Sequence, residues 1–211
     1  MTEIAELAST DRSKALLTAA WLSVVLGIVM QLLSLLAVSM PSLKVLSAEL
    51  VQKVSWSTLV CTGLAIGATA ARSRPTWMGI AGLIAAPAAF VIARTLQKSL
   101  AQALSVAGGG AGAGDVLTIA TIKSIQYGLF GLAIAAILRG GKGSVLACSL
   151  IGLVFGAIVA AIIVPYTASF VPTPPTQALV AKGINELFFP IGCALILYAS
   201  DNVGRRLVSK N

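Results

Sequence analysis

The chain has 211 residues and a formal net charge of +8, and 57% of its residues are hydrophobic while only 10% are charged. Its mean hydropathy is +0.95. An average soluble domain has roughly 25% charged residues, so this composition excludes an ordinary soluble protein and predicts an integral membrane protein.

Six long apolar runs follow one another along the chain. A membrane-spanning helix needs roughly 20 apolar residues, whereas a barrel strand takes about 9 to 11 and alternates polar with apolar positions. The sequence therefore predicts an all-α fold, a polytopic integral membrane helical bundle forming a single domain over 1–211. Its transmembrane helices, about six in number, are predicted at about 15–39, 54–71, 77–93, 116–138, 144–165 and 180–200.

The first run resembles a signal peptide in position only. It is longer than the usual hydrophobic region of roughly 7 to 15 residues, and the preceding stretch mixes Glu3, Glu6 and Asp11 with basic residues. We therefore expect a true first span.

The positive charges predict an orientation, because cytoplasmic loops are enriched in Lys and Arg. With the N-terminus inside, nine of the 15 basic residues face the cytoplasm. We therefore expect a multi-pass protein of the bacterial inner (plasma) membrane, with both termini cytoplasmic. The cytoplasmic set is Arg12, Lys14, Arg72, Arg74, Arg139, Lys142, Arg205, Arg206 and Lys210.

The segment after the third run has a different character. RTLQKSLAQAL, at 94–104, spaces Leu96, Leu100 and Leu104 four apart with polar residues between them, and AGGGAGAGD follows at 107–115. This pattern predicts an interfacial helix, or an extension of the third span, and then a Gly-rich outer loop within 94–115.

Three of the runs share a pattern that begins with lysine. The three segments are KVSWSTLVCTGLA from Lys53, KSIQYGLFGLA from Lys123 and KGINELFFPIGCA from Lys182. When they are aligned on the lysine, the residues three positions later are Trp56, Gln126 and Asn185. The pattern suggests a degenerate two-helix repeat in parallel orientation, although short matches between apolar helices also arise by chance. Internal duplication of this kind is common in transporters, which bind substrate between repeats.

Charged residues inside these runs are the candidate site. The apolar segments that follow Lys123 and Glu186 are each shorter than the roughly 20 residues that cross a membrane, so both residues lie within their predicted spans. A lysine can extend its ammonium to the headgroups, which would explain Lys53 and Lys123 without function, but a carboxylate has a short stem. We expect an outer-leaflet ligand-binding cluster that favours an anion, made of Lys53, Lys123, Gln126, Lys182, Asn185 and Glu186.

Three interpretations of this cluster stay open at the level of sequence. Lys182 and Glu186 are one helical turn apart and can form a structural ion pair, to which Lys123 and Gln126 add partners. The same groups can bind a solute or ion. A proton-coupling role for Glu186 is the third, and the adjacent lysines oppose it because they favour the ionised carboxylate.

Other motifs favour packing over chemistry. Gly63 with Gly67, and Gly152 with Gly156, have the spacing that allows close helix contact, inside one bundle or in a homo-oligomer. Cys61, Cys148 and Cys193 lie in separate apolar runs without metal-ligand spacing, so we expect small packing residues.

Function classes can be narrowed further. The sequence has no histidine, no paired carboxylates and no phosphate-binding glycine motif, so we expect no enzyme activity, no catalytic residue, no metal and no cofactor. The basic charge serves topology and membrane lipids rather than nucleic acid. Two alternatives remain: a channel or transporter-like, solute-binding protein, or a non-catalytic accessory or assembly subunit that binds other membrane protein subunits.

Overall fold

The computed structural model describes residues 2–37, 41–70, 76–105, 113–140, 143–170 and 176–208. These residues form six α-helices and no strand, which confirms the predicted all-α fold. In chain order the helices are α1 (Thr2–Leu35), α2 (Leu43–Ala70), α3 (Thr76–Ala103), α4 (Ala113–Arg139), α5 (Val145–Ala168) and α6 (Thr176–Val208).

Five of these helices are long and apolar enough to cross a membrane, namely α1, α3, α4, α5 and α6. The chain is therefore a multi-pass membrane protein by the length and composition of its helices. The exception is α2, whose first half carries Lys44, Glu49 and Lys53. α2 has 28 residues, as many as α3, so its composition rather than its length sets it apart. The structure describes all of its predicted span, 54–71, except residue 71.

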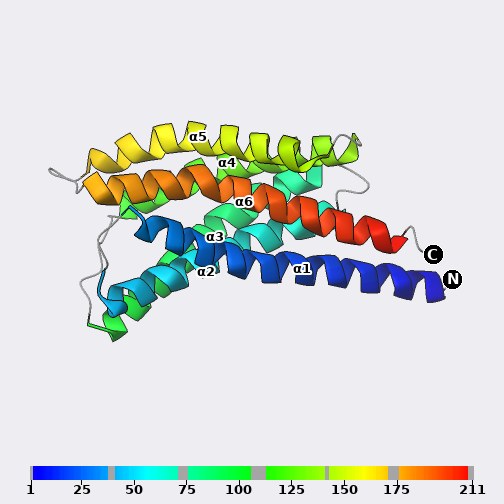
Figure 1. The fold of residues 1–211 in the computed structure, drawn as a ribbon, viewed down its shortest axis with the longest axis horizontal. Coiled ribbons are helices and arrows are strands. Elements are labelled where there is room, and N and C mark those ends of the chain that lie inside the picture. The colour runs from blue at the N-terminus through cyan, green and yellow to red at the C-terminus, as the bar shows by residue number, and fades with distance from the viewer. Residues whose placement is uncertain are drawn as a thin grey trace.

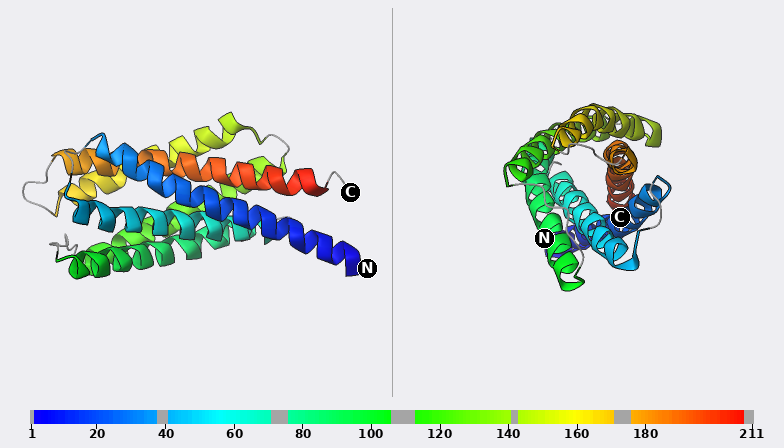
Figure 2. Two further views of the ribbon diagram at one scale, coloured as in Figure 1. Left: turned by 60° about the horizontal axis from the view of Figure 1, so that its bottom comes forward. Right: turned by 90° about the vertical axis from the view of Figure 1, so that its left-hand side faces the viewer.

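The six helices form a closed ring. Each helix packs against the next one in the chain, and α6 packs against α1 to complete the circle. Among these six neighbouring pairs, α4 and α5 have the smallest contact. α6 also contacts α2 and α4 across the interior. The helices run up and down the long axis of the bundle, and the chain begins and ends at the same end of it (Figure 1, Figure 2).

Residues 94–103 continue α3 without a break. Of the two structures predicted for this segment, the helix is thus an extension of the third span. The predicted Gly-rich loop lies outside the described residues from 106 to 112, and 113–115 begin α4. The structure does not place either end of the bundle in the cytoplasm, and the predicted orientation stays a prediction.

Glycines allow the helices to approach closely within the bundle. A Cβ atom on Gly63 of α2 would lie 2.5 Å from the Cβ of Ala85 on α3, and one on Gly152 of α5 would lie 2.6 Å from the Cα of Ile191 on α6. Neither distance is compatible with a side chain at the glycine. These small-residue motifs therefore pack helices of the same chain, the first of the two predicted roles.

Candidate functional site

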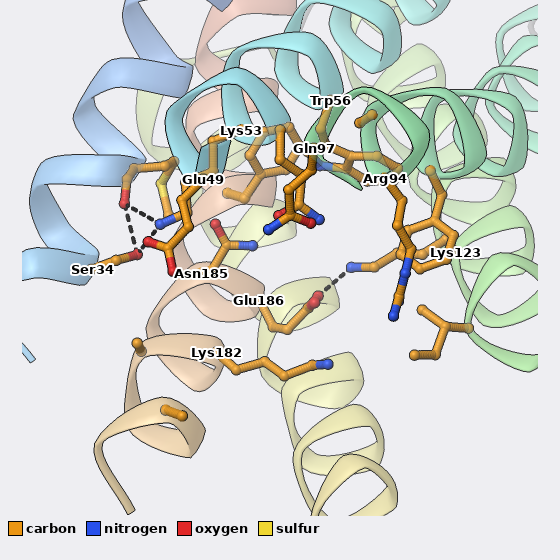
Figure 3. A pocket seen from close by; sticks show the side chains of 18 of the residues that line it. Ser34, Glu49, Lys53, Trp56, Arg94, Gln97, Lys123, Lys182, Asn185 and Glu186 are labelled. Carbon is orange, nitrogen blue, oxygen red and sulfur yellow. Dashed lines mark hydrogen bonds and ion pairs between the residues drawn. The ribbon is translucent and has the colours of Figure 1, made fainter. Parts of the chain in front are cut away.

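A cavity of about 350 Å³ lies at one end of the bundle, where α2, α4 and α6 begin and α1 and α3 end. Its volume is in the range of small-molecule sites, which is roughly 300 to 1,000 Å³. Figure 3 shows that its polar side chains converge from different helices on one space. The charged lining comprises the basic residues Lys53, Arg94, Lys123 and Lys182 and the acidic residues Glu49 and Glu186.

A buried ion pair forms one wall of the cavity. The ammonium of Lys123 on α4 donates to the carboxylate of Glu186 on α6, and each side chain is only 7% exposed. The same ammonium donates to Oε1 of Gln126, 3.3 Å away. It also lies over the rings of Trp56 and Tyr127, at 5.6 and 5.9 Å from their centroids. The charge of Lys123 is therefore satisfied by protein groups on three sides.

A proline lies one turn after Glu186 on α6. Pro190 has no N–H to donate to the carbonyl of Glu186, so the helix loses one hydrogen bond beside the carboxylate. Lys182 precedes Glu186 by one turn, and its side chain extends along the same side of the helix in Figure 3.

The opposite wall of the cavity is built by α1 and α2. The ammonium of Lys53 donates to Oγ of Ser34 at 2.5 Å and to the carbonyl of Met30 at 3.5 Å. Glu49, one turn before Lys53, accepts a hydrogen bond of 3.2 Å from Nε2 of Gln31. Polar groups of α1 therefore hold Glu49 and Lys53 in place.

Aromatic rings form the floor of the cavity. The ring of Trp56 contacts those of Phe90, Tyr127 and Phe189, with centroid distances of 6.2, 5.8 and 5.9 Å. Below these rings the interior is filled by side chains with no solvent exposure, including Val60, Leu64, Phe130, Ile134 and Leu197. The cavity therefore ends at these rings, and packed side chains fill the bundle below it.

The structure brings the six predicted site residues together. Lys53, Lys123, Lys182, Asn185 and Glu186 line the cavity, and Gln126 bonds to Lys123 next to it. Lys182 and Lys123 were both predicted as partners of Glu186, and the structure joins Glu186 to Lys123 on the other helix. The lysines that begin the three aligned segments, Lys53, Lys123 and Lys182, all line one cavity. The repeat itself stays a prediction.

Sequence reasoning missed Glu49, Arg94 and Gln97, which also line the cavity. Glu49 precedes Lys53 by four residues, the spacing of a pair on one helix face, and this signal was available. Arg94 and Gln97 belong to the segment expected at the membrane interface. Their face of α3 points into the bundle, while Leu96 is 44% exposed on the outside.

None of the three cysteines lines the cavity. The thiols of Cys61 and Cys193 are buried with their sulfur atoms 3.2 Å apart, and Cys148 is buried separately. Among the described residues, no three His, Cys, Asp or Glu side chains are arranged to hold a metal ion. The cavity is thus the candidate site, and its chemistry is that of charge and hydrogen bonding.

The chain matches no protein-family model, no curated protein and no solved structure.

Proposed function

We propose that the protein binds a small organic anion in this cavity, as the loading step of a transporter. The observation that supports the proposal is the excess of basic over acidic side chains around a cavity of ligand size in a membrane bundle. Ionisable groups at membrane depth are costly, and they are found mainly where they pair or line a substrate pathway. Here they do both.

The lining also suggests the shape of the ligand. The guanidinium of Arg94 lies 5.8 Å from the ring centroid of Phe90, and its planar fork of donors suits a carboxylate, sulfonate or phosphate group. Trp56 and Phe189 add apolar surface beside it. A small oxyanion that carries an apolar group fits both features. A free organic anion and the headgroup region of an anionic lipid share this chemistry.

The packed floor favours a carrier over an open channel. A channel needs a continuous polar passage, whereas fully buried side chains such as Phe130 and Ile134 fill the interior below the cavity. A carrier exposes its site to one side at a time by moving one part of the bundle against another. The loosest neighbouring pair in the ring, α4 and α5, is the natural place for that movement.

A single-tryptophan reporter tests the binding step. Trp21 and Trp77 are 68% and 47% exposed, so replacing both with phenylalanine leaves Trp56 in the cavity as the only tryptophan. In nanodiscs of zwitterionic lipid, benzenesulfonate should change the fluorescence of Trp56 saturably, and benzyltrimethylammonium, a cation of similar size, should not. Arg94→Gln should weaken benzenesulfonate binding by about 10- to 150-fold, since a hydrogen bond to a charged group contributes about 1.5 to 3 kcal/mol.

Further arms of this experiment separate the remaining alternatives. If phosphatidylglycerol in the nanodisc produces the change and competes with benzenesulfonate, the ligand is a lipid headgroup. If neither anion has an effect, or if the cation acts equally well, the proposal is wrong. Uptake of labelled benzenesulfonate into proteoliposomes tests transport, whereas a stoichiometric partner that copurifies with the protein, without uptake, supports the accessory-subunit alternative.

A further inference from the structure

The ammonium of Lys123 is already surrounded by protein groups. It donates to Glu186 and to Gln126, and the rings of Trp56 and Tyr127 lie beside it. An anion that takes Lys123 as its counter-ion must therefore compete with these partners. Because Glu186 is itself an anion, it is the partner with which the ligand competes.

Displacement leaves Glu186 in an unfavourable state. Its side chain is 7% exposed, and an ionised carboxylate that loses its partner at such burial is stabilised by taking up a proton. In the empty cavity Glu186 lies among more positive than negative side chains. The positive ones are Lys123 on α4, Lys182 on the same helix, Arg94 on α3 and Lys53 on α2, while Glu49 on α2 opposes them. A bound anion offsets this positive charge and removes the reason for ionisation.

We propose that the cavity binds an anion and a proton together, with the anion taking the place of Glu186 on Lys123 and the proton neutralising Glu186. This inference rests on the proposed anion binding and names how that binding is regulated. The starting state is the Lys123–Glu186 ion pair with an anion and a proton in the water of the cavity. The final state is a Lys123–anion pair and an uncharged carboxylic acid at Glu186. A monoanion is then loaded with no change in net charge.

The affinity for the anion must then depend on pH. Taking up one proton with the ligand makes binding tighter as pH falls, by at most about tenfold per pH unit. The Trp56 reporter measures this between pH 5.5 and 7.5 with benzenesulfonate, which stays anionic throughout. Glu186→Gln has no carboxylate to protonate, so its affinity should stay constant over this range. At pH 7.5 it should also exceed that of the protein with Glu186.

Glu49→Gln is the matched control because it removes the other carboxylate of the cavity and leaves the Lys123–Glu186 pair intact. It should keep the pH slope, whatever its affinity. A direct measurement uses a pH indicator in weakly buffered solution: adding sodium benzenesulfonate should raise the pH of the solution with Glu186 present and leave it unchanged with Glu186→Gln.

The outcomes separate this inference from the proposed function. Saturable binding with a flat pH profile and no proton uptake would show that the anion binds at Arg94 and Lys182 without displacing Glu186, and it would overturn the coupling while anion binding stands. A slope that survives Glu186→Gln and disappears in Glu49→Gln would assign the proton to the other carboxylate and overturn the inference as well. Absence of binding at every pH in both proteins would refute the proposed function and the coupling with it.

Discussion

Replacing Lys123 with methionine should destabilise the bundle severely at neutral pH. Methionine keeps an unbranched side chain of similar length but removes the charge that compensates Glu186. Removing one partner of a buried ion pair costs about 3 to 5 kcal/mol, and the 7% exposure of both side chains leaves little solvent to screen the orphaned carboxylate. The lost cation–π contacts with Trp56 and Tyr127 are partly replaced by contacts of the methionine sulfur with the same rings. We therefore expect Lys123→Met to lower the free energy of unfolding by about 3 to 5 kcal/mol.

A double-mutant cycle isolates the ion pair from these packing effects. Glu186→Gln keeps an amide oxygen as an acceptor for Lys123, and we expect it to cost about 1 to 3 kcal/mol. The double variant Lys123→Met with Glu186→Gln leaves no buried charge at the pair, so it should be more stable than Lys123→Met alone. Unfolding of the four proteins in one detergent, at one pH and protein concentration, gives the coupling between the two positions.

The pH dependence of Lys123→Met provides a second measurement. Its unpaired carboxylate becomes neutral at low pH, so the deficit relative to the protein with Lys123 should shrink as pH falls and grow as pH rises. The reasoning would be refuted by a double variant no more stable than Lys123→Met, together with a deficit that does not change with pH. That result would mean that Glu186 is hydrated well enough to stay charged without Lys123.

Two further predictions concern packing and topology. Gly156→Ala should destabilise the bundle by about 1 to 3 kcal/mol, since its Cβ would collide with the carbonyl of Leu187. The Cβ of Gly183→Ala would make an ordinary 3.7 Å contact with Val164. In the same unfolding assay, this variant should be neutral or stabilising by up to about 1 kcal/mol. Equal effects at the two sites would contradict the packing argument. In intact cells, a membrane-impermeant maleimide should label cysteine introduced at position 111 and not at position 3 or 209; labelling of 111 only after lysis would reverse the predicted orientation.

The fold was predictable because hydropathy alone specifies membrane helices. Backbone groups in hydrocarbon must bond within the segment, so a long apolar run has one favourable structure. α2 shows where this reasoning weakens. Glu49 and Lys53 in its first half lower the apolar content of the helix, and the structure compensates by pairing them with polar groups of α1 rather than with lipid. A hydropathy scale gives a charged residue the same value whether or not it has a polar partner in the folded protein.

The members of the site were predictable to a large extent, but the sequence did not decide between Lys123 and Lys182 as the partner of Glu186. A charge deep in an apolar run indicates a site at any position along it, so Lys123 and Glu186 could be identified directly. Their contact depends on the rotation of α4 and α6, which sequence spacing within one helix does not determine. Arg94 and Gln97 were missed as site residues for a related reason: an amphipathic segment can turn its polar face to water outside the bundle or to a cavity inside it.

The two walls of the cavity treat their lysines differently, and this difference bears on the proposed mechanism. Lys53 donates to the uncharged oxygens of Ser34 and Met30, so these hydrogen bonds hold its ammonium without cancelling its charge. Lys123 donates to the carboxylate of Glu186, so its charge is cancelled until that carboxylate is displaced or protonated. Glu49 lies one turn before Lys53 on the same wall but is not its hydrogen-bond partner. In the proposed mechanism, Lys123 accepts an anion only together with a proton. In a carrier, this arrangement would make release of the proton at the opposite side of the membrane the event that returns Glu186 to Lys123 and expels the anion.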